Sequence, residues 1–321
     1  AVRLEDYDQK VVLPHEGTRA EWVADRVKLM TAAQSNYSPL LSIFRDDLRS
    51  SVGNIVRAIA GGEPTAVFSP PDMPRLRLWR VSDPGTIDVL QSALKDADIF
   101  IADGHHRYEA ALRYRGSVRA EREVDHNESI NFRIMLLVSF DEPGLITRGY
   151  HRLVESATDE EFAEIVGSIE KTCDLEDWTP SEGLSTAEQI EEFSVALGER
   201  EDNEVTFGLY SKEPGKFHIA RMKSPHPAEN AIENSEYSHL HSHILGPAIA
   251  KEREERVISP HHDAALIAGQ IESGAARMAF IMRPVPLDEF VSIVTRGWRL
   301  PPKATNFYPK PPAGAVIQEF G

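Results

Sequence analysis

Two kinds of hydrophobic pattern alternate along this chain. In some stretches apolar and polar residues alternate one by one, which is typical of half-buried strands. In others apolar residues recur every three or four positions, which is typical of amphipathic helices. Strands are predicted at 75–81, 99–102, 132–140 and 278–282, with a hairpin from 205–210 and 216–222. Helices are predicted at 21–33, from a cap at Thr86 to residue 94, at 107–115, at 158–198 with a break at 180–183, and at 237–250, 264–274 and 287–295.

This mixture indicates an α+β or α/β architecture with helices flanking a mixed sheet, and we expect the α+β class. The longest compact apolar run, 134–140, makes 132–140 the expected central strand. The tail over 300–321 is rich in proline and is not expected to form a regular helix. We expect a single unit over 1–321. It would be subdivided into a core at 1–155, an acidic helical and hairpin part at 156–260, and a segment at 261–321 that returns to the core.

The amino-acid composition limits the kinds of ligand and partner that the chain can bind. Its 321 residues include 35 Lys and Arg against 51 Asp and Glu, a net charge of −16. A surface this acidic repels nucleic-acid backbones, so an anionic ligand must be small and held in a local pocket. The single cysteine, Cys173, forms no intramolecular disulfide and indicates a reducing compartment. No apolar run approaches the ~18 residues of a membrane span, and the charged start is unlike a signal peptide. We therefore expect a cytoplasmic protein whose partner is a small molecule.

The most informative motif is Ile101-Ala102-Asp103-Gly104-His105-His106-Arg107-Tyr108. A buried strand runs through a glycine turn directly into a helix, and the N–H groups at a helix start form an anion site. His105, His106 and Arg107 add donors suited to phosphate oxygens. Asp103 could orient a histidine, hold Mg²⁺ or accept a proton. The alternative is an ordinary helix start with Asp103 as its cap and histidines on the surface.

The tail carries a second set of polar side chains within a proline-rich stretch. Lys303, Thr305, Tyr308 and Lys310 are candidates for a clamp on an anionic ligand, because an acidic chain has little general use for a cationic loop. The alternative is a structural strap in which Phe307 and Tyr308 pack onto the core. Both roles can hold together.

Several histidines lie outside the main motif. His15 and Glu16 follow a strand-like stretch, and Glu16 could act as a general base, although spacing alone favours a solvated loop. His239 and His243 lie four residues apart on a predicted helix, with His241 between them. No carboxylate motif accompanies the pair, so solvated or capping histidines are favoured over a metal site. Asp263 is expected to cap the helix that follows a loop at 261–262, and the acidic surroundings of Cys173 argue against a catalytic thiol.

The run from Ile101 to Leu112 resembles the signature of the DUF1015 family, and the resemblance extends over essentially the whole chain. Residues 12–18 resemble its Pro-His-Glu-x-Thr segment and 33–41 its Asn/Tyr-Ser-Pro segment. Tyr150-His151-Arg152 resembles its Thr-His-Arg element, with Tyr150 in place of threonine. Residues 302–310 resemble its Pro-Gln-Lys-Ser-Thr-x-Phe-Tyr-Pro-Lys element, with Pro302 and Ala304 departing from it. Family members usually begin with a further aromatic- and proline-rich segment, which is expected to be absent here.

The Asp-Gly-His-His-Arg run is also similar to that of free-serine kinases of the ParB/sulfiredoxin-like superfamily. The resemblance implies a ParB/sulfiredoxin-like core and phosphoryl transfer from ATP or pyrophosphate to free L-serine. It implies that Gly104, His105, His106 and Arg107 hold the donor, while Asp103 holds Mg²⁺ or orients a histidine. Asp103 and His105 are also candidate catalytic residues. A separate carboxylate deprotonates the serine hydroxyl in those kinases, and Glu16 is the best candidate here. The further clamp candidates are His15, His151, Arg152, Lys303, Thr305, Tyr308 and Lys310.

Two other functions remain open from the sequence. One is a ParB-like regulatory module that binds a nucleotide without turning it over. The other is a metal-dependent phosphoesterase with Asp103, His105 and His106 as ligands. The sequence does not fix the oligomeric state.

Overall fold

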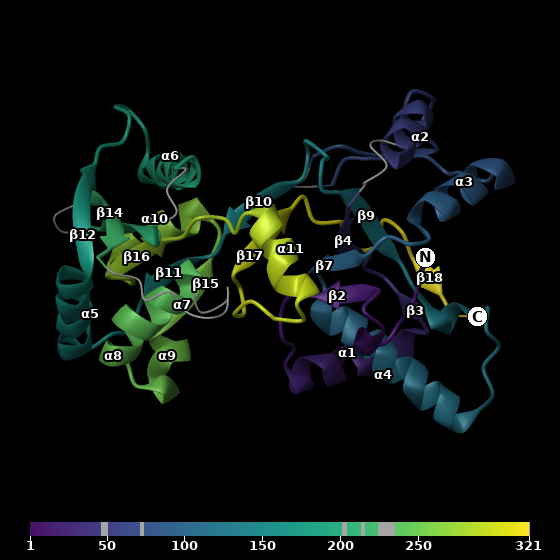
Figure 1. Cartoon of the computed structure of the whole chain (residues 1–321), viewed down its shortest axis with the longest axis horizontal. Coiled ribbons are helices and arrows are strands. Elements are labelled where there is room, and N and C mark those ends of the chain that lie inside the picture. The colour runs from purple at the N-terminus through teal and green to yellow at the C-terminus, as the bar shows by residue number, and fades with distance from the viewer. Residues whose placement is uncertain (46–50, 71–73, 201–203, 213–215, 224–234, 321) are drawn as a thin grey trace. The chain divides into compact units, whose positions relative to one another are not determined.

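The computed structural model describes residues 1–45, 51–70, 74–200, 204–212, 216–223 and 235–320. Within them the chain forms two compact units. The first comprises residues 1–14, 18–145 and 310–321, and the second comprises 15–17 and 146–309. Each is described by itself below, with the labels of Figure 1. The three-part subdivision expected from composition stays a prediction.

The first unit is built around a four-stranded mixed sheet in the order β2-β7-β4-β9. β7 runs parallel to β2 and antiparallel to β4, and β9 runs parallel to β4. The strands of this unit are β1 (Val2–Arg3), β2 (Val12–Pro14), β3 (Ser35–Asn36), β4 (Leu40–Phe44), β5 (Ala66–Phe68), β6 (Leu76–Leu78), β7 (Ile99–Asp103), β8 (Phe132–Arg133), β9 (Met135–Ser139) and β18 (Gln318–Glu319). Its helices are α1 (Ala20–Ala33), α2 (Ser51–Ala60), α3 (Pro84–Leu94) and α4 (His105–Glu121), with 3₁₀ turns at Tyr7–Gln9 and Ser129–Asn131.

Helices α1 and α4 lie together against this sheet (Figure 1). The buried cluster between them takes Val23 and Met30 from α1 and Tyr108 from α4, together with Val12 of β2 and Ile101 of β7. Burying side chains of this size removes large apolar areas from water, which is the main force that holds the layers together. The loop between β7 and α4 is therefore fixed by packing on both sides.

The second unit contains a six-stranded antiparallel sheet in the order β12-β14-β13-β16-β11-β15. Helices α6 and α10 supply Phe193 and Ile267 to a buried cluster with Leu153, Phe217 and Ile281 of the sheet. The strands are β10 (Ile146–Gly149), β11 (His151–Val154), β12 (Cys173–Trp178), β13 (Thr206–Ser211), β14 (Lys216–Met222), β15 (Ile258–His261), β16 (Met278–Ile281) and β17 (Thr305–Tyr308). The helices are α5 (Asp159–Thr172), α6 (Thr186–Gly198), α7 (Glu236–Leu240), α8 (Gly246–Ala248), α9 (Lys251–Val257), α10 (Ala264–Ser273) and α11 (Leu287–Thr295), with a π-helical turn at His241–Leu245.

The α+β class with a mixed sheet is confirmed, but several elements differ from the sequence prediction. The expected central strand is split into β8 and β9, and β9 lies at the edge of its sheet. The acidic stretch at 158–198 is not all helix, since β12 separates α5 from α6. α3 is capped by Asp83 rather than Thr86, because Asp83 Oδ2 accepts the Thr86 N–H at 2.7 Å. The strand at 75–81 shrinks to 76–78, and the expected helix at 237–250 is interrupted by the π-helical turn.

The hairpin of β13 and β14 is confirmed, although residues 213–215 lie outside the described residues. Asp263 caps α10 as predicted, accepting the Ala265 N–H at 2.9 Å and the Leu266 N–H at 3.2 Å. His261, expected on a loop, lies on β15. Among the described residues, no helix has the combination of length and apolar composition required to cross a membrane.

Candidate functional site

The predicted glycine turn joins β7 to α4 in the first unit, and the helix begins at His105, two residues earlier than expected. Gly104 has a φ of 104°, in the left-handed region that side chains disfavour. A Cβ at this position would lie 2.8–3.0 Å from the Arg107 guanidinium. Glycine is required because it combines this φ with so close an approach. Gly104 offers no side-chain cap, so the first turn of α4 keeps the polarity that attracts anions.

Two cations converge on the carboxylate of Asp103. Arg107 donates from Nη2 to Oδ2 at 2.5 Å, and Lys310 donates from Nζ to Oδ1 at 2.8 Å. Arg107 also donates to the Pro39 carbonyl oxygen at 2.7 Å. Burial lowers the pKa of Arg107, and the charge of Asp103 opposes that shift. The immediate surroundings of Asp103 therefore carry more positive than negative charge.

A small cavity of about 60 Å³ lies beside these groups in the same unit. Three arginines line it, namely Arg26, Arg107 and Arg133, together with Asn36 and Tyr37 among others. A water molecule needs about 10–15 Å³ of such space, so the cavity can hold a few waters or one small tetrahedral anion. Guanidinium groups are the side chains best suited to bind phosphate oxygens in pairs.

Arg133 is the most unusual of the three arginines. Its side chain is 3% exposed, and its Nη2 donates to the Ser38 carbonyl oxygen at 2.9 Å. Its Nε is buried and has no hydrogen-bond partner among the described residues. Burial, reinforced by the charge of Arg107, lowers the pKa of Arg133 to about 9. A buried donor without a partner is rare in folded proteins and indicates a missing ion, ligand or water.

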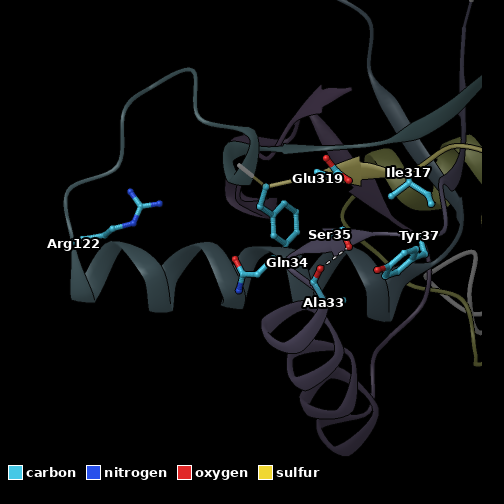
Figure 2. Close-up of a pocket in the computed structure, with 8 residues that line it drawn as sticks. Ala33, Gln34, Ser35, Tyr37, Arg122, Ile317 and Glu319 are labelled. Carbon is cyan, nitrogen blue, oxygen red and sulfur yellow. Dashed lines mark hydrogen bonds between the residues drawn. The ribbon is translucent and has the colours of Figure 1, made fainter.

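Figure 2 shows the residues that line a second, larger cavity of the same unit. It has a volume of about 710 Å³, and it shares Ser35 and Tyr37 with the small cavity. Tyr37 and Ile317 contribute apolar surface, with 42% and 48% of each residue exposed. The remaining lining residues are Ala33, Gln34, Arg122, Glu319 and Phe320. This volume is within the range that organic ligands occupy.

The two histidines of the motif have different surroundings. His105 is buried at the start of α4. His106 Nε2 accepts the Arg19 N–H at 3.0 Å, and its ring lies 5.0 Å from that of Trp22. His106 therefore contacts the residues that begin α1. The roles of both histidines in donor binding stay predictions.

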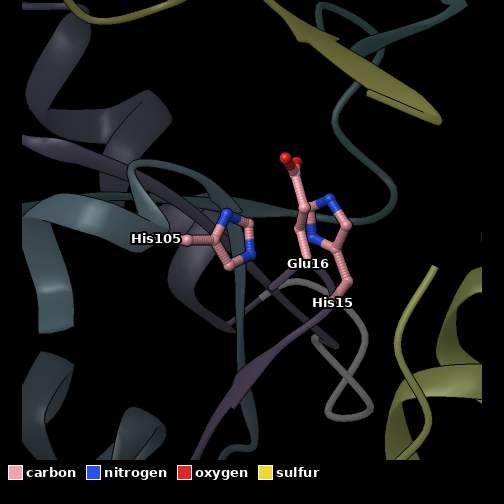
Figure 3. A group of neighbouring side chains, drawn as sticks. All are labelled: His15, Glu16 and His105. Carbon is pink, nitrogen blue, oxygen red and sulfur yellow. The ribbon is translucent and has the colours of Figure 1, made fainter. Parts of the chain in front are cut away.

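His15 and Glu16 belong to the second unit, whereas His105, drawn with them in Figure 3, belongs to the first. The expectation of a solvated loop is wrong for His15, which is 2% exposed. Its Nε2 lies 2.8 Å from the Thr305 hydroxyl, and its ring lies 5.0 Å from that of Phe290. The Glu16 carbonyl oxygen accepts from Arg299 at 3.1 Å, while the Glu16 carboxylate is half-buried. Glu16 as general base stays a prediction.

His151 and Arg152 are buried on β11, and backbone groups surround both. His151 Nδ1 accepts the Met282 N–H at 3.1 Å, and burial lowers the pKa of His151 to about 3. Arg152 donates from Nη1 to the carbonyl oxygens of Tyr150 at 3.0 Å and Lys303 at 3.1 Å. The same guanidinium lies 4.8 Å from the centre of the Tyr237 ring. These contacts are those of an arginine that holds backbone segments together. The role of Arg152 as a ligand clamp stays a prediction.

The tail candidates are divided between the two units. Lys310 belongs to the first unit, and Lys303, Thr305 and Tyr308 belong to the second. The alternative of a structural strap is right for Phe307, which is 1% exposed and packs against Phe290. It is wrong for Tyr308, which is 39% exposed. Lys303 has a positive φ of 59°, and its Nζ lies 5.4 Å from the centre of the Tyr150 ring.

Asp103 does not form a magnesium site as it stands. Mg²⁺ in proteins is usually held by one or two carboxylates together with substrate phosphates and water. Both oxygens of Asp103 are engaged by Arg107 and Lys310, so a metal ion would have to displace an ammonium or a guanidinium. Asp103 as an Mg²⁺ ligand stays a prediction. A catalytic thiol at Cys173 is disfavoured further, since burial raises its pKa.

Sequence reasoning missed Arg26 and Arg133 as lining residues of the small cavity. Arg26 lies on the predicted first helix, and Arg133 lies on a predicted strand more than 20 residues after Arg107. Nothing in their spacing relates them to the motif. The one available signal was the Asn-Tyr-Ser-Pro segment at 36–39, which lies at the same cavity and whose carbonyl groups bind Arg107 and Arg133.

The chain belongs to the family described as "Protein of unknown function (DUF1015)", whose model matches residues 1–243. A search of curated proteins finds no match. Among solved structures, a free serine kinase variant in complex with AMP is similar with 12% identity and a TM-score of 0.45, over 94% of this chain and 88% of that one. A conserved hypothetical protein from Pyrococcus furiosus has 13% identity and a TM-score of 0.41 over 94% and 91% of the two chains. SbnI from Staphylococcus aureus, with a C-terminal truncation, has 9% identity and a TM-score of 0.41 over 93% and 79%.

Proposed function

We propose that this protein is a small-molecule phosphotransferase that binds a phosphate group of its donor in the small cavity of the first unit. The observation that carries the proposal is the unpartnered Nε of the buried Arg133, in a cavity that Arg26 and Arg107 also line. Asp103 is the carboxylate that pairs with Arg107, and it also receives Lys310. A bound phosphate would supply the negative charge and the acceptor atoms that these cations lack. The positive end of α4 adds to the same attraction.

The donor in this proposal is a nucleotide rather than pyrophosphate. The large cavity shares Ser35 and Tyr37 with the small one, so a nucleoside can occupy the first while its phosphates reach the second. Pyrophosphate would leave the large cavity without a ligand. The Tyr37 ring is exposed enough to stack on a base, and Figure 2 shows it near Ile317.

The acceptor is taken from the resemblance of residues 103–107 to the motif of free-serine kinases, which implies free L-serine. In the transfer, the serine oxygen would form a bond to the terminal phosphorus of the donor, and the bond from that phosphorus to the leaving nucleotide would break. The hydroxyl proton would pass to a carboxylate base, for which Glu16 is the candidate that the resemblance offers. Phosphoryl transfer depends mainly on positioning and on neutralising charge, and the arginines of the small cavity supply both.

Phosphorus NMR provides the test. The full chain is incubated with L-serine, Mg²⁺ and either ATP, ADP or pyrophosphate, and phosphoserine is followed over time. We expect phosphoserine with a nucleotide donor and none with pyrophosphate. Glu16→Gln should abolish product while leaving nucleotide affinity nearly unchanged, because a base acts on the acceptor.

The outcomes separate the alternatives. Tight nucleotide binding without any product would overturn the transferase and support the regulatory module that the sequence left open. Release of inorganic phosphate without serine would support a phosphoesterase. Phosphoserine from pyrophosphate would refute the nucleotide donor but keep the transferase. Normal nucleotide affinity in Arg133→Met would remove the small cavity from the site.

A further inference from the structure

A pair of histidines in the second unit lies apart from every residue used above. His239 is on α7, and His243 is in the π-helical turn that follows it. Their rings stack with centroids 5.5 Å apart and an interplanar angle of 21°. From the sequence these histidines were expected to be solvated or to cap the helix. The structure overturns that expectation for His239, which is 4% exposed.

The hydrogen bonding of His239 is unusual. Both of its ring nitrogens are buried, and within the part of the chain that the structure describes neither has a hydrogen-bond partner. A neutral imidazole carries one N–H donor and one nitrogen lone pair, and burial without partners is costly for both. Such a lone pair is what a metal ion requires from histidine.

His241, which lies between the two, is engaged in a different way. Its Nδ1 lies 2.5 Å from Oε1 of Glu254 on α9, so it has a carboxylate partner. The turn itself depends on Gly246, because a Cβ there would lie 2.8 Å from the His241 carbonyl oxygen. The Gly246 N–H donates to that same oxygen. π-helical turns inside helices are often found at functional sites.

We propose that His239 and His243 bind one divalent transition-metal ion, with water completing its coordination. Imidazole ligands suit Zn²⁺, Ni²⁺ and Cu²⁺, whereas Mg²⁺ and Ca²⁺ prefer oxygen ligands. His243 is only partly buried, so the metal can be reached from solvent and can keep open positions. The site shares no residue with the proposed phosphotransferase, whose phosphate cavity belongs to the first unit.

Calorimetric titration of the full chain with ZnCl₂ provides the first test. The variants are His239→Leu, His243→Ala and the double variant, and His241→Ala is the matched control from the same turn. Loss of either proposed ligand should weaken the strongest Zn²⁺ site by about tenfold or more, whereas the control should change it little. Equal affinity and stoichiometry in the wild type and the double variant would overturn the proposal.

Two further measurements keep the test decisive if one variant folds poorly. Electron paramagnetic resonance of bound Cu²⁺ should show two nitrogen ligands in the wild type and one in His243→Ala. This variant is chosen because the His243 side chain is partly exposed in the wild type, so that its loss should disturb the fold little. Zn²⁺ should raise the melting temperature of the wild type but not that of His239→Leu. In the presence of a chelator, His239→Leu should be at least as stable as the wild type, because it removes an unpartnered polar group from the interior. If the wild type in the presence of a chelator were clearly more stable than His239→Leu, the His239 ring would have a structural role, and this would contradict the proposed metal site.

Discussion

Each unit buries one arginine that has no carboxylate partner among the described residues. The two arginines, Arg152 and Arg133, differ in how many of their hydrogen-bond donors have an acceptor. In the second unit, Arg152 gives hydrogen bonds to backbone carbonyls and lies on the Tyr237 ring. In the first unit, Arg133 has one carbonyl partner and a buried Nε with none, beside the cation Arg107. The two residues are almost equally buried, at 4% and 3% exposure. Burial alone therefore does not distinguish the two arginines, whereas unused hydrogen-bonding capacity beside a cavity makes Arg133 the candidate for ligand binding.

Replacing Arg152 and Arg133, one at a time, by methionine should separate the structural role from the binding role most strongly. Arg152→Met removes the donors to the Lys303 and Pro302 carbonyls and leaves these oxygens without that partner. We expect the free energy of unfolding to fall by about 2–5 kcal/mol. Chemical denaturation monitored by circular dichroism measures the loss. Unchanged stability would mean that Arg152 is not the structural cation described above.

Acid should affect the second unit through His151. Its pKa is about 3 in the fold against 6.5 for an ordinary histidine, so between these values the unfolded chain binds a proton that the folded chain does not. Stability should therefore be fully present above pH 6.5 and fall by about 1.4 kcal/mol per pH unit as the pH drops towards 3. His151→Asn retains an acceptor for the Met282 N–H but does not titrate there. A denaturation series from pH 7 to pH 4 should show a shallower slope for this variant, and identical slopes would exclude His151 as the cause.

Arg133→Met is the counterpart of Arg152→Met and should act on binding rather than on stability. Loss of its charge-assisted hydrogen bonds should weaken nucleotide binding by about 1.5–3 kcal/mol. Stability should stay the same or rise, because the variant removes a desolvated charge that Arg107 repels. Isothermal titration with a nucleotide, alongside a melting curve, checks both. If Arg133→Met lost much stability but no nucleotide affinity, Arg133 would be a structural arginine like Arg152 and not a ligand-binding one.

The smallest effect is expected at Lys310. Its side chain is 40% exposed and pairs with Asp103, so solvent screens its charge. Lys310→Gln should weaken nucleotide binding by about 0.5–1 kcal/mol at low salt, and by less at physiological ionic strength, where the Debye length is about 8 Å. Affinity measured at two salt concentrations tests this. A loss that is independent of salt would point to a geometric role for Lys310.

The sequence predicted elements well where one local pattern decides the structure. The buried strand at 99–102, the glycine turn and the helix after it were recognised because local packing and a conformational requirement agree there. β12 was missed because its middle residues, Asp174 to Asp177, are mostly charged, and their partners are distant in sequence. Asp177 lies 3.0 Å from His218 on the paired strand β14, and Asp174 lies 3.9 Å from Lys223, the residue that follows this strand. Such cross-strand charge pairs stabilise a sheet edge without producing a hydrophobic pattern.

The same limit applies to the candidate site. Residues 103–107 could be proposed from the sequence because helix-start chemistry is local. Arg133 could not, because its importance depends on a cavity formed by α1, β3 and α4 together. Likewise, the burial of His239 depends on tertiary packing that a spacing of four residues does not encode.

The return of the chain to the first unit at Lys310 has a consequence for the order of events during synthesis. Gln318 on β18 binds Asn36, the Ile134 N–H and the carbonyl groups of Ser129 and Phe132, and Phe320 stacks on Tyr114. About 160 residues, nearly all in the second unit, separate these contacts from Leu145. At ribosomal speeds of about 5–20 residues per second, the first unit waits roughly 10–30 s for its last strand. During that time β3 has an unpaired edge, and the nascent chain must remain soluble before Lys310 can reach Asp103.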